Sequence, residues 1–259
     1  MPSPVEKAAR LRALHVAGRP LVLFNIWDVG SARAVEAAGV AALATGSWSV
    51  AKANGYADGE KVPLDLAIAN IARIAAATEL PLSADLETGY GADADAVGRT
   101  VERAIAAGAV GCNLEDSIPG ASGLRPIEEQ AARIRAARRA GAGIGSRHFI
   151  NARTDVFFQG PATGHDETML AAALERGRAY AAAGADGLFV PGLVDLGLIE
   201  RLTAQSPLPV NIMVGGSTPA LRLLAEARVA RVSHGPGPFV AMTKMLESAA
   251  RAAMTMTAE

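Results

Sequence analysis

A short apolar segment ending at Asp85 and Glu87, followed by the glycine-containing turn 88–91, carries the most informative acidic residues of this chain. Side chains of a strand alternate between its two faces, so a strand through Glu87 would place both carboxylates on one face. Neighbouring carboxylates repel each other, and a shared proton or a hard cation such as Mg²⁺ relieves that repulsion. A single pair of carboxylates of this kind is typical of a solvated strand end, so its meaning depends on the residues at the ends of the other strands.

Helix–glycine–strand units repeat along the chain and predict a parallel sheet. Alanine-rich helical segments stop at Gly39, Gly108 and Gly184, and a short apolar strand follows each stop. Glycine directly after a helix is a common end signal, and strands that alternate with helices favour parallel pairing. The predicted strands are 21–26, 41–46, 80–87, 110–115, 149–155, 187–191, 209–214 and 230–234.

Eight strand–helix units in 259 residues predict an α/β fold, a (β/α)8 TIM barrel, as a single domain over residues 1–259. An extra helix at 6–16 precedes the first strand, and the last predicted helix spans 239–254. The alternative is an open doubly wound sheet, which normally has fewer strands and a glycine-rich phosphate loop after its first strand. This chain has Asp28-Val29-Gly30 there, so we favour the barrel, whose active site lies at the carboxyl ends of the strands.

Composition excludes several classes of function. The net charge of −1 and the lack of basic blocks give no indication of nucleic acid or of an anionic membrane surface as a partner. No apolar run reaches the ~20 residues of a membrane span, and the charged start lacks a signal-peptide core. The single cysteine, Cys112, fits a reducing compartment, and strand parity turns it toward the helices as a packed core residue. We expect a soluble, cytoplasmic protein.

Polar residues gather at the predicted strand ends. They are Asn25, Asp28, Thr45, Ser47, Asp85, Glu87, Asn113, Glu115, Asp116, Asn151, Arg153, Asp155 and Asn211, with Gly46 and Trp48 next to Ser47. Several carboxylates at one barrel mouth would repel each other without a cation or an anionic ligand. We predict Mg²⁺, with Mn²⁺ as a substitute, held by carboxylates directly or through water, and Arg153 facing a carboxylate or phosphonate of the substrate. Such a site favours a reaction through an enolate, with the metal stabilising the oxyanion.

These residues resemble the isocitrate lyase/phosphoenolpyruvate mutase superfamily over about 21–234. The matching segments are 25–28, 31–33, 44–47, 55–60, 85–91, 113–116, 151–155, 184–186 and 209–211. The resemblance implies that Asp85 is the direct Mg²⁺ ligand and that Asp58, Glu87 and Glu115 hold the metal's waters. It further implies an oxo-acid cradle around Ser47, a carboxylate or phosphonate anchor at Arg153 and a polar contact from Asn211. We take the neighbours of Ser47, namely Thr45, Gly46 and Trp48, as part of the cradle.

The resemblance also implies a homotetramer, arranged as a dimer of dimers, in which the last helix is often swapped between neighbouring barrels. One segment departs from the superfamily pattern. Residues 117–126, after Glu115-Asp116, lack the Lys-Lys/Arg-Cys-Gly-His segment of the lyases and the lysine and asparagine of the phosphonate mutases. Only Arg125 supplies charge to this loop, so we do not expect isocitrate or methylisocitrate cleavage by the usual route.

The leading hypothesis is a Mg²⁺-dependent enzyme that cleaves a C–C bond in a small α-oxo or α-hydroxy (di)carboxylate. Decarboxylation or hydrolysis of an oxaloacetate-like compound fits, with Asp58, Glu115 and Arg153 as catalytic residues. The first alternative is P–C chemistry, as a phosphonopyruvate hydrolase or a phosphoenolpyruvate or carboxyphosphonoenolpyruvate mutase, with Asp58 as nucleophile or base. The second alternative is an oxo-acid-binding barrel without catalysis, and tight oxalate or pyruvate binding without turnover would favour it.

Overall fold

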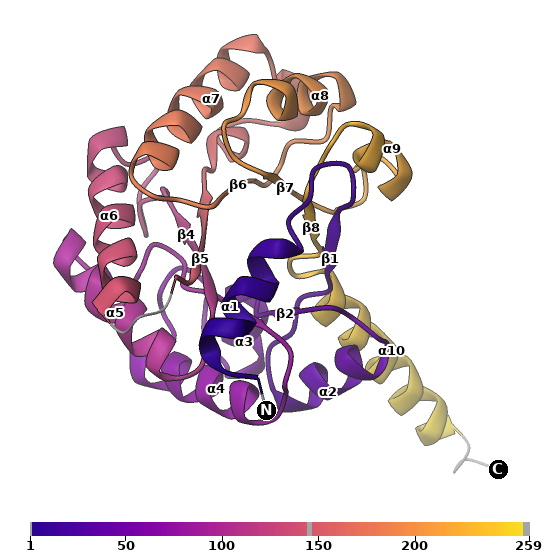
Figure 1. Ribbon diagram of the computed structural model, residues 1–259. Coiled ribbons are helices and arrows are strands. Elements are labelled where there is room, and N and C mark those ends of the chain that lie inside the picture. Colours follow the sequence, from indigo (N-terminus) through magenta and orange to yellow (C-terminus); the bar gives the residue numbers. More distant parts are fainter. Residues whose placement is uncertain (1, 144–146, 256–259) are drawn as a thin grey trace.

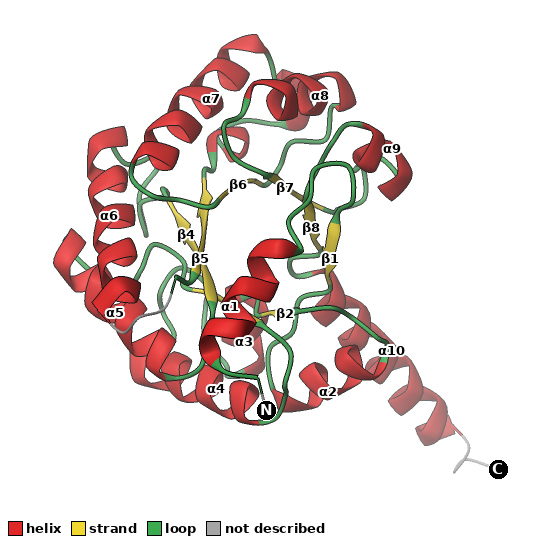
Figure 2. Cartoon of the chain, viewed as in Figure 1, coloured by secondary structure: helices red, strands yellow, loops and turns green. Residues whose placement is uncertain are grey.

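The computed structural model describes residues 2–143 and 147–255. Its strands form one parallel sheet in the order β1-β8-β7-β6-β5-β4-β3-β2 (Figures 1 and 2). All eight predicted strands are confirmed, and each is shorter than its predicted range. The observed strands are β1 Leu21–Leu23, β2 Leu43–Ala44, β3 Leu82–Asp85, β4 Gly111–Glu115, β5 Phe149–Arg153, β6 Gly187–Val190, β7 Val210–Met213 and β8 Arg231–Ser233.

The sheet closes between β1 and β2 just beyond the two strands. Ile26 and Thr45 form an isolated parallel bridge. The backbone N–H of Ile26 donates to the carbonyl of Ala44 at 2.9 Å, and the N–H of Gly46 donates to the carbonyl of Ile26 at 3.0 Å. Since β1 also pairs with β8, the strands complete a ring. The predicted (β/α)8 barrel is confirmed, and the open doubly wound sheet is excluded.

Helices surround the sheet (Figure 2). Four of them, α2, α5, α7 and α8, begin after an aspartate whose side chain accepts a backbone N–H of the first turn, a cap that satisfies an otherwise unpaired donor. The helices are α1 Pro4–Ala13, α2 Val29–Ala37, α3 Ser47–Ala53, α4 Leu64–Ala76, α5 Ala94–Ala106, α6 Ile127–Gly143, α7 Glu167–Ala182, α8 Leu196–Gln205, α9 Leu221–Glu226 and α10 Gly237–Thr255, with short 3-10 turns η1 Val156–Phe158 and η2 Ala162–Gly164.

Helix α1 covers the amino-terminal end of the barrel, where it crosses in front of the strands in Figure 1. Its Leu11 is fully buried and packs with Val110 and Phe149 in a small core. At Gly111 a Cβ atom would lie 2.7 Å from Leu11 Cδ2, so a larger residue there would push α1 away. Because α1 closes this end, the barrel is open to ligands at the carboxyl ends of its strands.

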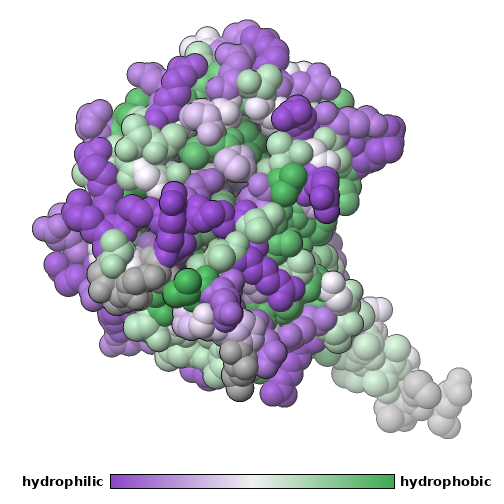
Figure 3. Space-filling view, viewed as in Figure 1, coloured by the Kyte–Doolittle hydropathy of each residue, from purple (hydrophilic) through white to green (hydrophobic). Residues whose placement is uncertain are grey.

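Helix α10 projects from the body of the barrel (Figure 1). Figure 3 shows polar side chains over much of the viewed face, whereas the projecting arm is coloured mostly in the apolar half of the scale. None of the helices in ranges 2–143 and 147–255 is long and apolar enough to cross a membrane. The prediction of one domain over 1–259 includes residues 1, 144–146 and 256–259, which lie outside the described residues, and it stays a prediction.

Candidate active site

A cavity of about 190 Å³ opens at the carboxyl ends of the strands. Of the residues predicted for catalysis, substrate binding or the metal, six line it, namely Gly46, Ser47, Trp48, Asp58, Asp85 and Arg153. The other lining residues are Asn25, Ser49, Asn113, Phe158, Phe189, Met213, Ser233, Gly235 and Pro236. Four of the residues predicted for these roles are not part of the lining, namely Thr45, Glu87, Glu115 and Asn211.

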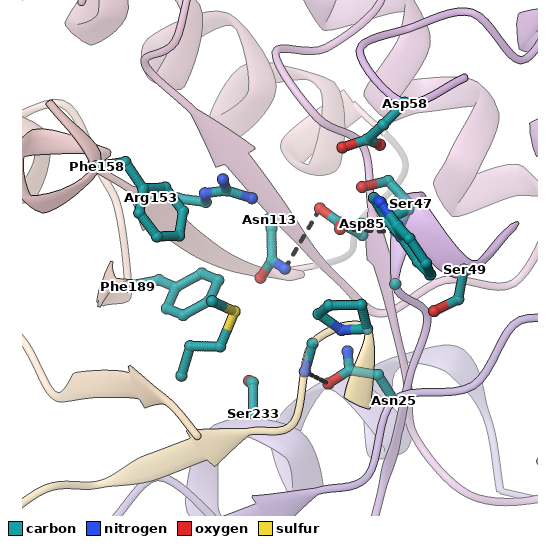
Figure 4. A pocket seen from close by; sticks show the side chains of 15 residues that line it. Asn25, Ser47, Ser49, Asp58, Asp85, Asn113, Arg153, Phe158, Phe189 and Ser233 are labelled. Carbon is teal, nitrogen blue, oxygen red and sulfur yellow. Dashed lines mark hydrogen bonds between the residues drawn. The ribbon is translucent and has the colours of Figure 1, made fainter. Parts of the chain in front are cut away.

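Asp85 is the last residue of β3 and lies at the edge of the cavity (Figure 4). Its backbone N–H donates to the Thr45 hydroxyl at 2.8 Å, so Thr45 holds the strand end. Its Oδ2 accepts the backbone N–H of Ser47 at 2.9 Å, and the Asn113 amide lies 3.5 Å from Oδ1. The carboxylate is therefore fixed in position while still bordering the cavity.

Asn113, opposite Asp85 on β4, is oriented by a polar network inside the barrel. Its Oδ1 accepts from Asn151 Nδ2 at 2.9 Å and from Arg231 Nη2 at 3.4 Å, which leaves its Nδ2 to face Asp85. Arg231 is fully buried, and this burial lowers the pKa of its guanidinium to about 10.

Asn211 belongs to the same interior network rather than to the cavity wall. Its Nδ2 donates to the Ser233 hydroxyl at 3.1 Å, and Arg231 Nε donates to the same oxygen at 3.2 Å. The predicted substrate contact from Asn211 therefore remains a prediction, and Ser233 is the member of this network that borders the cavity.

Glu87 lies in the turn after β3, not in the strand as the sequence predicted. Its φ is +52°, and Glu60 and Tyr90 also have positive φ values, +60° and +52°. Such conformations cost about 1–3 kcal/mol each outside glycine and persist where tertiary contacts hold them. Here Glu60 N–H donates to Glu87 at 2.6 Å, the Tyr90 hydroxyl donates to Glu87 at 3.0 Å, and the Glu60 carboxylate accepts from Thr88 and Tyr90. The predicted alternation of side chains between the two faces of the strand therefore does not extend to Glu87.

The turn holds Glu87 in a buried position behind Asp85. Its exposed fraction is 4%. Burial raises the pKa of Glu87 to about 7, and the neighbouring charges of Asp85 and Asp58 add to the shift. Glu87 therefore interacts electrostatically with Asp85 and Asp58, which line the cavity, although Glu87 is not itself part of the lining.

Arg153, at the end of β5, is held by two carboxylates. Its Nη1 lies 2.7 Å from Glu115, its register neighbour on β4, while Nε and Nη2 donate to Asp155 at 2.6 and 2.9 Å. Burial alone would lower the pKa of Arg153, but Glu115 and Asp155 outweigh it and raise that pKa. Burial raises the pKa of Glu115, while Arg153 acts against that shift. Glu115 is therefore connected to the cavity by its ion pair with Arg153.

Asp58 comes from the loop before α4, and its carboxylate points toward Asp85 from the neighbouring wall (Figure 4). Burial raises the pKa of Asp58, and the negative charge of Asp85 raises it further. A carboxyl group with a raised pKa at the edge of a cavity is suited to hold and transfer a proton.

The carboxylates fit a hydrated divalent cation. Within the described part of the chain, no three His, Cys, Asp or Glu side chains are close enough to bind one metal ion directly. Asp85 nevertheless raises the pKa values of Asp58 and Glu87, so these groups form a negative cluster that a cation would neutralise. Mg²⁺ usually keeps several waters and needs only one or two protein carboxylates, which agrees with Asp85 as a single direct ligand.

The loop 117–126 lies beside the Arg153 carboxylates. The Ser117 hydroxyl donates to Asp155, and residues Ser117 and Leu124 form a bridge that folds the loop on itself. Arg125 donates to Glu129 on α6 at 2.6 Å, so the one charge of the loop is paired outside the cavity.

Sequence reasoning missed the apolar part of the cavity. Phe189 and Met213 lie on β6 and β7, and Phe158 lies in η1 just after β5. The strand-end rule was applied only to polar side chains. Applied to apolar ones as well, the same rule would have found Phe189 and Met213, because both sit near the carboxyl ends of predicted strands.

Comparisons with known proteins place the chain in a family. A family model described as phosphoenolpyruvate phosphomutase matches residues 11–254. The chain is 33% identical over 250 residues to 2-methylisocitrate lyase of Salmonella typhimurium, covering 91% of this chain and 81% of that protein. A crystal structure of a phosphonomutase candidate from Burkholderia cenocepacia is 55% identical, with a TM-score of 0.95, covering 97% of this chain and 100% of that one.

A phosphonopyruvate hydrolase solved in complex with oxalate and Mg²⁺ is 25% identical, with a TM-score of 0.80 and coverage of 95% of this chain and 86% of that one. The matching family model is named after a mutase, and the relatives include a lyase and a hydrolase, which makes the chain a member of an enzyme family. The resemblance in its motifs is confirmed, and the chain belongs to the isocitrate lyase/phosphoenolpyruvate mutase superfamily.

Proposed function

We propose that the protein is a Mg²⁺-dependent enzyme that cleaves a C–C bond in a small α-oxo or α-hydroxy carboxylate through an enolate. The observation that carries the proposal is Asp85, fixed by Ser47 and Thr45 at the edge of a compact cavity and surrounded by carboxylates of raised pKa. The relative solved with oxalate and Mg²⁺ supports the same ligand chemistry. Mn²⁺ would bind the same oxygen ligands.

Each residue has a role that follows from its position. Asp85 would hold the cation directly, and Asp58 and Glu87 would hold its waters. Bound Mg²⁺ supplies positive charge that stabilises the oxyanion of an enolate. The N–H groups of Arg153 not used by Glu115 and Asp155 are available to the substrate carboxylate.

In this proposal, Asp58 transfers the proton. When the C–C bond breaks, its electron pair passes into the enolate, whose carbon must then take a proton. Asp58 borders the cavity, and its raised pKa favours the protonated form that can donate. The loop 117–126 has no lysine, cysteine or histidine, its Arg125 is paired with Glu129, and Cys112 is buried among core residues.

The second candidate is P–C chemistry on phosphonopyruvate. It is favoured by the phosphonomutase candidate at 55% identity and by the matching family model. In this case Asp58 would act as nucleophile or base and Arg153 would face the phosphonate.

Proton and phosphorus NMR distinguishes the candidates. The purified protein with Mg²⁺ is given oxaloacetate, alkylated malates, methylisocitrate and phosphonopyruvate, with Asp85→Ala in parallel because Mg²⁺ alone decarboxylates oxaloacetate. Cleavage of a carboxylate above that control supports the proposal. Conversion of phosphonopyruvate to phosphate or phosphoenolpyruvate, with carboxylates untouched, supports the second candidate. Tight oxalate binding without any turnover supports the non-catalytic barrel.

We further propose a homotetramer and a cytoplasmic location. The first rests on the family resemblance, and α10, which projects from the barrel and exposes Met245 and Leu246, offers a surface for the contact. The second rests on the single buried cysteine and on the composition of the chain.

A further inference from the structure

The layer of side chains beneath the cavity is polar. Ser83, Asn151, Asn211 and Arg231 each stand two positions before a residue that lines the cavity, so their side chains point to the inside of the barrel one layer deeper. All four are buried. Bulky apolar residues ordinarily fill such a layer in a (β/α)8 barrel. A buried polar layer costs stability, which indicates that it serves the cavity above it.

Arg231 is the charged member of this layer, and it has no carboxylate partner. Its side chain is fully buried, and within ranges 2–143 and 147–255 it bonds to neutral groups. Nε donates to the Ser233 hydroxyl at 3.2 Å and Nη2 to Asn113 Oδ1 at 3.4 Å, while the buried Nη1 has no partner in these ranges. Since its pKa falls only to about 10, with the charge of Asp85 acting against the effect of burial, the guanidinium stays positive at neutral pH.

The Arg231 side chain crosses the inside of the barrel. Strands β8 and β4 are four places apart in the closed ring of eight, so they form opposite walls. Arg231 on β8 bonds to Asn113 on β4, and its guanidinium therefore lies between these walls. Asn113 and Ser233 line the cavity, whereas Arg231 does not. A positive charge thus lies directly beneath two residues that a ligand can touch.

Arg231 determines which way the Asn113 amide faces. The neighbouring Asn151 carries both an acceptor and a donor, so the two amides alone would fit in either orientation. Arginine has no acceptor, and the Asn113 atom next to it must therefore be Oδ1. Nδ2 then faces Asp85 and the cavity (Figure 4). One of its two N–H groups is left for a ligand.

The Ser233 hydroxyl is oriented in the same way. It accepts from Arg231 Nε and, at 3.1 Å, from Asn211 Nδ2, which occupies both of its lone pairs. Its proton can go to Asn211 Oδ1, 3.3 Å away, or to a ligand oxygen in the cavity. Asn113 and Ser233 are thus both prepared to donate to an anionic oxygen.

We propose that Arg231 is a positioning residue for the anionic ligand of the cavity. It holds Asn113 and Ser233 as donors toward carboxylate or enolate oxygens of an oxo acid, and its own charge attracts those oxygens from below. The inference rests on the proposed function, since it assumes that an acid and a cation bind together beside Asp85. The charge of Arg231 repels that cation, so anion binding and cation binding depend on Arg231 in opposite directions.

Two binding measurements separate this role from a purely structural one. Electron paramagnetic resonance of free Mn²⁺ gives the affinity for the cation alone, and isothermal titration calorimetry with saturating Mn²⁺ gives the affinity for oxalate. Arg231→Met removes the charge and should bind oxalate at least about tenfold more weakly but Mn²⁺ alone at least about twofold more tightly. Arg231→Lys keeps the charge and should retain the wild-type Mn²⁺ affinity, with a smaller loss of oxalate affinity than Arg231→Met.

Ser233→Ala tests the positioning without removing the charge. It should bind oxalate at least about threefold more weakly and leave Mn²⁺ binding unchanged, because only a hydrogen-bond donor to the anion is lost. This small change decides the question even where Arg231→Met does not fold. Arg138→Met is the matched control, because it removes a guanidinium that pairs with Asp186 at the other end of the barrel, and it should keep both affinities.

The outcomes also separate the inference from the proposed function. If Arg231→Met folds and loses less than about threefold in oxalate affinity, the inference is wrong while the proposed function stands. A folded Arg231→Met that binds oxalate and Mn²⁺ both more weakly shows a structural role and overturns the inference as well. Wild-type oxalate affinity in Ser233→Ala also contradicts it. If the wild-type protein binds no oxalate with Mn²⁺, the proposed function fails and the inference fails with it.

Discussion

Cys112 and Asp85 lie on neighbouring strands but on different faces of the barrel wall. Cys112 pairs in register with Ala84, one residue before Asp85, and it belongs to the core between strands and helices. Burial raises the pKa of the Cys112 thiol to about 12, so a thiolate nucleophile is not available near neutral pH. The sequence-based prediction that Cys112 packs in the core is confirmed.

A Cys112→Ala variant should therefore keep its activity. We expect kcat/KM within about twofold of wild type and a loss of about 1 kcal/mol in the free energy of unfolding, because a small buried group is removed. Steady-state kinetics and urea denaturation measure the two quantities. A folded variant without activity would contradict the core role and would restore a catalytic cysteine.

Glu87 makes stability depend on pH and on Mg²⁺. Its pKa is about 7 in the folded protein against 4.5 ordinarily, so the folded state keeps a proton that the unfolded state has lost. This contribution is complete below about pH 4.5 and disappears as the pH rises through 7; it amounts to about 3 kcal/mol at most. Mg²⁺ favours the ionised carboxylate and should therefore raise the Tm more at pH 8 than at pH 5.5.

Thermal melts of wild type and Glu87→Gln, with and without Mg²⁺, isolate the contribution of this one carboxyl group. Without Mg²⁺, wild type should lose stability relative to Glu87→Gln between pH 5.5 and 8. A stability difference between wild type and Glu87→Gln that stays constant over this range would show that Glu87 is ionised throughout and would contradict its raised pKa.

Among the secondary-structure elements, Asp186 connects four parts of the barrel at its amino-terminal end. Its carboxylate accepts from Arg12 of α1, from Arg138 of α6 and, at 2.9 Å, from the backbone N–H of Ile150 on β5, while Asp186 itself directly precedes β6. The side chain is 5% exposed, so removing it leaves the buried N–H of Ile150 without its acceptor and takes the partner carboxylate from two arginines.

Asp186→Ala should lower the free energy of unfolding by about 3–5 kcal/mol. Asp65→Ala is the matched control. It removes an ion pair to Arg103 whose aspartate is 89% exposed, and it should cost less than about 1 kcal/mol. Denaturant titration compares the two, and equal losses would contradict the structural role of Asp186.

The elements also show what the sequence could predict. Helix–glycine–strand units recur because each βα unit must end a helix and begin a buried strand, and this local pattern located all eight strands. The position of Glu87 could not be predicted in the same way. Its left-handed backbone depends on hydrogen bonds from Glu60 and Tyr90, and Glu60 lies 27 residues away in the chain. A tertiary contact of this kind leaves no local pattern.

The candidate site was predicted unevenly for a similar reason. Asp85 and Arg153 end their strands with side chains toward the cavity, as alternation predicts. The side chain of Asn211 also points to the inside of the barrel, as alternation predicts, but it bonds to Ser233 instead of lining the cavity. Its position along the barrel axis depends on how far neighbouring strands are shifted against each other. Strand stagger emerges only when the barrel closes.

At the scale of the whole molecule, α10 leaves the barrel and exposes apolar side chains. We expect the chain to assemble as a homotetramer in which α10 packs on a neighbouring barrel. Leu246→Glu should shift the mass measured by light scattering toward smaller species, because a charge would be buried at the contact. Leu221→Glu changes a similarly exposed leucine on α9 and should leave the mass unchanged. A wild-type monomer would contradict the assembly.

The most direct test of the account is the cation dependence of turnover in Asp85→Ala, measured by NMR on whichever substrate wild type cleaves. Asp95→Ala, which changes an exposed aspartate on α5, is the control for the loss of one negative charge. We predict that Asp85→Ala folds normally, loses at least about a thousandfold in kcat/KM and gains nothing from added Mg²⁺, whereas Asp95→Ala keeps wild-type turnover. Wild-type turnover by a folded Asp85→Ala variant would contradict the metal site and the mechanism built on it.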